Sequence, residues 1–164
     1  MPHDPLPKVK AIAILLILGA IAALIASLVD SEVLRLLSPG ILLNVLIAPV
    51  VEELCKVIVM AIPSHRNPLN GMAVGLGFGL LEAILVSPAF QINRLVGSIP
   101  LHTSAGGIEG HALHSKRYWL IIGAILLHIS FNALNLVDGT TSFQILIAIC
   151  PAVIFLYLNF RAKQ

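Results

Sequence analysis

The chain has 164 residues, of which 58% are hydrophobic and 11% are charged, and its net charge is +2. Soluble globular domains average about 25% charged residues. This composition, with a mean hydropathy of +0.98, is therefore that of an integral membrane protein and argues against a soluble domain. The small net charge gives no reason to expect a nucleic-acid partner. The length suits one compact membrane domain over residues 1–164.

Six apolar segments follow one another along the chain. They cover roughly residues 9–29, 40–62, 70–89, 94–112, 118–137 and 141–160. Because about 20 apolar residues cross the hydrocarbon core of a bilayer, we predict an all-α polytopic membrane fold with about six transmembrane helices. The fourth segment contains Pro100 and several glycines, so we expect it to be short, bent or partly re-entrant.

Lysine and arginine residues gather on one side of this predicted topology. With six spans, both termini and the loops at 63–69 and 111–117 share a side, and that side holds Lys8, Lys10, Arg66, Lys116, Arg117, Arg161 and Lys163. The opposite side holds Arg35 and Arg94. Basic loops stay in the cytoplasm, so we predict that both termini are cytoplasmic and that the protein resides in the cell (plasma) membrane.

Glycines recur at four-residue intervals in the third segment, at Gly71, Gly75 and Gly79. Glycines at this spacing line one face of a helix and allow another backbone to approach closely. We interpret this face as a helix-packing surface.

Ionisable side chains lie at similar depth within four of the apolar segments. They are Glu52, Glu53 and Lys56 in the second, Glu82 in the third, His102 in the fourth and His128 in the fifth, with Asn132 one turn further on. On insertion scales a charged side chain at the centre of a membrane helix costs roughly 2.5–3.5 kcal/mol. So many groups are better explained by convergence on one wet cavity within a motif core at residues 40–137.

The spacing within the segments places these groups on shared helix faces. Glu52 and Lys56 are four residues apart and can pair, and His128 and Asn132 have the same spacing. Two adjacent carboxylates cannot both ionise cheaply in a low dielectric. One of Glu52 and Glu53 is therefore expected to hold a proton more readily, while Lys56 keeps the other charged. Such a pair would place a carboxylate base beside imidazoles that orient water.

Several common hydrolase motifs do not occur in the sequence. It has no HExxH motif of zinc metalloproteases and no GxSxG nucleophile elbow. We place Asp30 and Asp138 at helix ends, where solvation is easy, and this argues against an intramembrane aspartyl pair.

The ordered polar residues resemble the four motifs of the PrsW group of intramembrane proteases. This group forms a superfamily with the type II CAAX prenyl endopeptidases and the bacteriocin-processing enzymes. The matching residues are Glu52, Glu53 and Lys56 for EExxK, Phe78 and Glu82 for FxxxE, His102 for the third motif, and His128 and Asn132 for HxxxN. CAAX enzymes tend to carry a histidine at the position of Glu82, so the glutamate favours the PrsW side.

This resemblance implies an all-helical membrane core and peptide-bond hydrolysis by a glutamate-activated water. It implies that Glu52 is the general base and that Glu53, held by Lys56, supports it. It also implies that His102 helps to position the water. The expected partners are the lipid bilayer and a substrate that is a membrane protein or a lipidated peptide.

The resemblance further implies that His128 and Asn132 steady the water or the oxyanion. Glu82 is expected to orient a histidine or to share protons, and Phe78 to support the site. No cofactor is expected, and zinc is the less favoured possibility. If a metal were used, its ligands would be Glu52, Glu82, His102 and His128.

A non-hydrolytic membrane protein is the alternative that these residues leave open. A proton-coupled or metal-ion carrier would also use buried glutamates and histidines. Carriers are often built from inverted repeats, and no internal repeat is visible in the sequence. A binding scaffold would not need Glu52 to ionise, so its Glu52 variants would keep their function.

Overall fold

The structure is a computed structural model of the whole chain, and it describes residues 6–36, 40–62, 66–86 and 97–137. The helices are α1 (Leu6–Leu36), the π-helix η1 (Leu43–Ile47), α2 (Ala48–Met60), α3 (Pro68–Val86), α4 (Ile99–Ser115) and α5 (Trp119–Val137). No strand occurs in these ranges, which confirms the all-α prediction for the described residues. The predicted sixth segment, residues 141–160, lies outside them.

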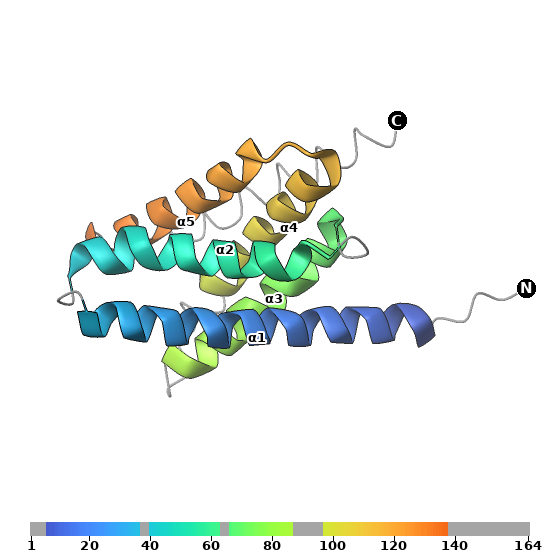
Figure 1. Cartoon of the computed structure of the whole chain (residues 1–164), viewed down its shortest axis with the longest axis horizontal. Helices are drawn as coiled ribbons and strands as arrows, with labels where there is room; N and C mark the ends of the chain where they lie inside the picture. The colour runs from blue at the N-terminus through green and yellow to red at the C-terminus, as the bar shows by residue number, and fades with distance from the viewer. Residues whose placement is uncertain (1–5, 37–39, 63–65, 87–96, 138–164) are drawn as a thin grey trace, which may run out of the picture.

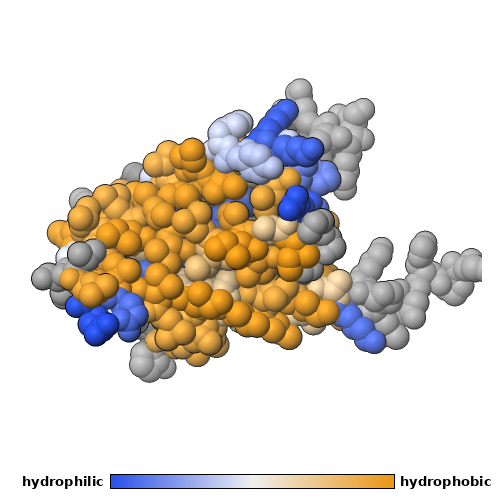
Figure 2. Space-filling view, viewed as in Figure 1, coloured by the Kyte–Doolittle hydropathy of each residue, from blue (hydrophilic) through white to orange (hydrophobic). Residues whose placement is uncertain are grey.

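Two of the helices are long and apolar enough to cross a membrane. They are Val9–Val33 of α1 and Pro68–Leu85 of α3, and Trp119–Asn135 of α5 is a shorter apolar stretch. Large apolar side chains such as Ile17 and Ile122 are exposed. Figure 2 shows a face that is apolar over nearly its whole extent, with hydrophilic residues towards its ends. A continuous apolar surface of this kind suits lipid contact.

Helix α1 is longer than the first apolar segment, because it continues through Asp30 to Leu36. The assignment of Asp30 to a helix end was therefore wrong, since the apolar window Val9–Val33 includes it. At the exposed end of α1, Arg35 Nε pairs with Glu32 Oε2 at 2.9 Å. Oppositely charged side chains three residues apart stabilise a helix, so these charged residues extend α1 where they were expected to end it.

A proline accounts for the π-helix that leads into α2. Pro49 has no N–H, and its ring would clash with the carbonyl group four residues earlier in a regular α-helix. The chain widens instead, and the Ala48 N–H donates to the Leu43 carbonyl oxygen, five residues back. Pro49 offers no donor to the Asn44 carbonyl oxygen, and Asn132 Nδ2 of α5 donates to that oxygen at 3.0 Å. This hydrogen bond fixes α5 against the start of α2.

Helix α3 packs between α1 and α4 through its glycines. A Cβ atom added at Gly75 would meet the His102 carbonyl oxygen, and one at Gly71 would meet the Gly106 carbonyl oxygen. On the opposite side, a Cβ atom at Gly77 would meet the backbone of Leu16 in α1. The prediction that this glycine pattern serves helix packing is confirmed. The close approach of α3 to α4 also brings the backbone at His102 against α3.

The fourth segment forms one α-helix of 17 residues, so of the expected short, bent or partly re-entrant forms the structure shows the short one. Pro100 lies in the first turn of α4, where the absence of an N–H costs nothing. The helix ends at Lys116, whose φ of 58° is left-handed and whose N–H donates to the Ala112 carbonyl oxygen. The glycines of α4 are used for packing against α3, and they leave the helix intact.

Replacing Gly75 tests this close packing. Gly75→Ala is expected to lower the thermal unfolding midpoint in detergent, because overpacking costs about 1–3 kcal/mol and each kcal/mol corresponds to about 2–4 °C at this chain length. The control is Gly123→Ala on α5, where a Cβ atom meets nothing within 4 Å. That change is expected to be neutral or slightly stabilising. Equal midpoints for the two variants would contradict the α3–α4 geometry.

Candidate active site

Helices α2 to α5 each direct ionisable side chains to the interior of the bundle. The clustered residues are Glu52, Glu53 and Lys56 of α2, Glu82 of α3, His102 of α4 and His128 of α5. These six are the ionisable groups that the sequence predicted to converge. The structure therefore brings together side chains that lie up to 76 positions apart in the chain (128 − 52).

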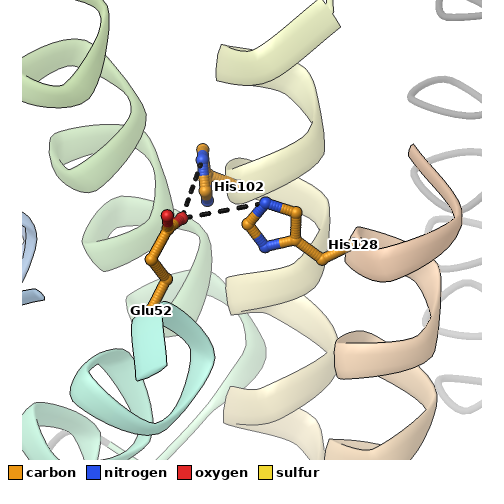
Figure 3. A group of neighbouring side chains, drawn as sticks. All are labelled: Glu52, His102 and His128. Carbon is orange, nitrogen blue, oxygen red and sulfur yellow. Dashed lines mark ion pairs between the residues drawn. The ribbon is translucent and has the colours of Figure 1, made fainter. Parts of the chain in front are cut away.

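The Glu52 carboxylate faces both imidazoles (Figure 3). Its Oε2 atom lies 3.8 Å from His102 Nε2 and 3.7 Å from His128 Nε2. It has no hydrogen-bond partner among the described residues. These distances are too long for direct hydrogen bonds, but they suit three groups that contact one shared atom. The Glu52 side chain is 14% exposed and His102 only 1%, so Glu52 lies on the more accessible side of the cluster.

Glu53 is fully buried and held by two partners. Its Oε2 atom lies 2.5 Å from Lys56 Nζ, and its Oε1 atom lies 2.7 Å from His128 Nδ1. The expectation that Lys56 holds Glu53 is therefore confirmed, and the pairing of Lys56 with Glu52 that the four-residue spacing allowed is not the one that forms. Spacings of three and four residues both allow a pair, and here Lys56 and Glu53 share the buried face of α2 while Glu52 lies towards the exposed side.

The contact with Glu53 also sets the tautomer of His128. A carboxylate accepts hydrogen bonds, so His128 Nδ1 carries the proton that is donated to Glu53 Oε1. In the neutral ring the Nε2 atom is then the acceptor, and this atom faces Glu52. Glu53 thus orients an imidazole that can take a proton at the centre of the site.

Glu82 contacts His102 at the interior of the bundle. His102 Nε2 lies 2.8 Å from Glu82 Oε2, and Ser98 Oγ donates to the same oxygen at 2.6 Å. The centroid of the Phe78 ring lies 4.7 Å from the centroid of the His102 ring and 5.4 Å from Lys56 Nζ. Phe78 therefore lies beside both the lysine and His102.

Asn132 lies one helical turn beyond His128, and its amide group binds backbone. The hydrogen bond from Nδ2 to the Asn44 carbonyl oxygen is 3.0 Å long. Because this bond ties α5 to the π-helix, it holds the turn that carries His128. A role of Asn132 at the water or the oxyanion stays a prediction.

Two residues of the cluster were not predicted as site residues. Glu109 of α4 is fully buried, with Oε2 4.0 Å from Lys56 Nζ. Its position seven residues after His102 puts it on the same helix face, which is a sequence signal that was overlooked. Ser98 stands just before α4, and its spacing to Glu82 follows no helical period, so its role could be seen only in the structure.

The residues present fit a metal ion as well as a water molecule. Ligand atoms of Glu52, His102 and His128 all lie within 4.8 Å of one another. Zinc bonds to nitrogen and oxygen are about 2.0–2.2 Å long, so the separations of 3.8 and 3.7 Å between Glu52 Oε2 and the two Nε2 atoms suit a shared ion. However, His102 Nε2 is hydrogen-bonded to Glu82. A zinc ion would replace that hydrogen bond or recruit Glu82 as a further ligand.

The cluster can support proton transfer to and from one central position. Glu52 offers a carboxylate oxygen without a hydrogen bond, and the two imidazoles beside it are held by Glu53 and Glu82. Comparisons with protein-family models, curated proteins and solved structures find no match for the chain. The geometry of these side chains is therefore the basis on which chemistry is assigned to the site.

Proposed function

We propose that the protein is an intramembrane endopeptidase of the PrsW kind, which hydrolyses a peptide bond with a water activated by Glu52. The observation that carries this proposal is the position of Glu52 Oε2, which faces the Nε2 atoms of His102 and His128 at 3.8 and 3.7 Å without a hydrogen bond of its own. A water between these three atoms would contact a base and two imidazoles at once.

In the proposed reaction, Glu52 takes a proton from the water as its oxygen attacks the scissile carbonyl carbon. The tetrahedral intermediate then collapses, the C–N bond breaks, and the proton passes from Glu52 to the leaving amine. His128 Nε2 faces the same position and can relay this proton, since Glu53 holds the Nδ1–H. His102 Nε2 is hydrogen-bonded to Glu82, and it would position the water by exchanging or sharing that hydrogen bond with it. One water is consumed, and one carboxyl and one amino terminus are formed.

Glu53 is proposed to support the base without replacing it. Lys56 and His128 both contact its oxygens, so the negative charge of Glu53 is already stabilised. A carboxylate that is stabilised in this way takes up a proton less readily than one without partners. Glu52, whose Oε2 has none in the described structure, is the stronger candidate for the general base.

The substrate is proposed to be a membrane protein or a lipidated peptide, because the site lies in a bundle with an apolar outer surface. We also propose the six-span topology, with both termini in the cytoplasm and the protein in the plasma membrane. Two helices of the described residues are long and apolar enough to cross a membrane, and the distribution of Lys and Arg supports the orientation.

A cleavage assay in liposomes tests the function. The purified full chain is mixed with a panel of single-span and lipidated peptides, each labelled so that cleavage is seen by mass spectrometry. We expect cleavage that persists after treatment with a chelator. Cleavage that chelator removes and zinc restores would assign Glu52, His102 and His128 to a metal-dependent hydrolase. Absence of cleavage across the panel would count against the protease.

A metal-ion carrier is the second candidate, and the grouping of three ligand atoms within 4.8 Å favours it. A carrier would bind the ion without needing the water-activating role of Glu52. Flux of zinc into the same liposomes, with no peptide cleavage, would support the carrier. Cleavage without flux would support the endopeptidase.

A further inference from the structure

Glu109 is a buried carboxyl group for which the proposed reaction has no step. It is fully buried on α4, and its Oε2 atom lies 4.0 Å from Lys56 Nζ. Glu53 itself is 2.5 Å from Lys56 Nζ. One ammonium group thus lies beside two carboxyl groups, and none of the three side chains is exposed.

The charges of this group do not balance if every member is ionised. Two carboxylates and one ammonium leave one negative charge, and a buried unpaired charge is costly enough that the group usually neutralises. Among the described residues, Lys56 of α2 is the cation that lies beside Glu109, at 4.0 Å from its Oε2 atom. From the other helices packed against α4, Glu82 of α3 contacts His102, and His128 of α5 contacts Glu53. Neither of these two brings Glu109 a positive counter-charge directly.

Hydrogen bonding leads to the same conclusion. Two ionised carboxylates have no proton to donate to each other, so a hydrogen bond between them requires that one is protonated. Glu53 is ion-paired with Lys56 and accepts a hydrogen bond from His128, and both contacts favour its ionised form. Neither Glu109 oxygen receives a hydrogen bond from a described donor. Of the two carboxyl groups, Glu109 therefore keeps the proton.

We propose that Glu109 is a protonated carboxylic acid that donates a hydrogen bond to Glu53, and so acts as a positioning residue for the Glu53–His128 pair. Glu53 then has the Lys56 ammonium as its counter-ion and two donors, from His128 and Glu109, which hold it ionised and fixed. The positioning role of Glu109 rests on the proposed function. In that reaction the water proton goes to Glu52, and a Glu53 held by Glu109 stays charged. The protonation state itself is independent of what the protein does.

Infrared spectroscopy of the purified full chain in lipid tests the protonation state. A protonated carboxylic acid has a C=O stretching band that carboxylates lack. We expect this band at neutral pH, with a part of its intensity that is lost in Glu109→Gln. Glu32→Gln, at an exposed glutamate of α1, is the control for the loss of one carboxyl group. The band shifts in heavy water, which separates it from lipid ester absorption.

The competing arrangement places a positive charge on His128, so that both glutamates can be ionised. In that case the Glu109→Gln spectrum would keep all of the band intensity of the unmodified chain, and this result would overturn the proposal. Loss of intensity in Glu53→Gln with none in Glu109→Gln would also overturn it, because the proton would then belong to Glu53. No substrate is needed, so the result stands whether or not the chain is a protease.

The positioning role is tested with the cleavage assay and two variants of similar size. Glu109→Gln keeps an N–H that can donate to Glu53, whereas Glu109→Met has no donor. A hydrogen bond to a charged group is worth enough to change a rate by about tenfold or more. We expect kcat to be at least about tenfold higher in Glu109→Gln than in Glu109→Met, with little difference in KM. Equal kcat values would refute the positioning role while leaving the infrared assignment intact.

Discussion

Glu52→Gln is expected to lower the cleavage rate by about 10²–10⁴-fold, which is the usual contribution of a positioned general base. Glutamine has the size of glutamate but cannot take a proton from water. The Oε2 atom of Glu52 makes no hydrogen bond in the described structure, and the side chain is 14% exposed, so an amide fits without loss of a partner. The thermal unfolding midpoint should therefore change little while kcat falls.

The matched control for this loss is Glu32→Gln. Glu32 lies at the end of α1 in an exposed pair with Arg35, far along the chain from any motif residue. Both variants remove one carboxylate, so a general effect of charge on liposome binding would appear in both. Cleavage by Glu52→Gln at the rate of the Glu32→Gln control would exclude Glu52 as the base. If Glu53→Gln were then inactive with a native unfolding midpoint, the base would be Glu53.

The convergence of the ionisable side chains on one site could be predicted because lipid solvates charged groups poorly. A glutamate or histidine side chain that faces acyl chains is costly. Ionisable groups at similar depth on four helices are therefore expected to face the interior of the bundle. Burial of Glu53, Lys56, His102 and His128 follows this rule. The glycine spacing on α3 could be interpreted for a similar reason, since only glycine permits the contact between Gly75 and the His102 backbone.

The partners within the site could not be predicted from spacing. Residues three and four apart are both neighbours on a helix, so the spacing allows Lys56 to pair with either Glu53 or Glu52. The choice depends on how α2 is rotated, and that rotation depends on the packing of other helices. The π-helix in front of α2 adds to the uncertainty, because it changes the direction in which every later side chain points. The link from Asn132 to the Asn44 carbonyl oxygen arises from the same π-helix.

Glu109 was not predicted as a site residue for a different reason. Its seven-residue spacing from His102 puts it on the same face of a regular helix, but the fourth segment was expected to be short, bent or partly re-entrant. In a bent segment that face would not continue. Because α4 is one α-helix from Ile99 to Ser115, the face is continuous and Glu109 reaches Lys56. Glu109 can therefore be assigned to the site only once the fourth segment is known to be a continuous helix.

Lys56→Met is expected to destabilise the fold strongly. It removes the ammonium group beside a fully buried carboxylate, and breaking a buried ion pair on one side costs about 3–5 kcal/mol. At about 2–4 °C per kcal/mol for a chain of this length, the thermal unfolding midpoint should fall by roughly 10 °C. The control is Arg35→Met, which breaks a pair of the same spacing with side chains 73% and 65% exposed. Exposed pairs contribute about 0–1 kcal/mol, so this midpoint should barely move.

The double variant Lys56→Met, Glu53→Gln separates stability from function. With both charges removed, no unpaired charge is buried, and the combined loss should be smaller than the sum of the single losses. The protein would regain stability, yet His128 would lose the carboxylate that holds its Nδ1–H. We therefore expect the double variant to fold better than Lys56→Met and still to cleave far more slowly than the unmodified chain. Additive losses in midpoint would show that Lys56 and Glu53 are not coupled, and full cleavage by the double variant would remove Glu53 from the proposed mechanism.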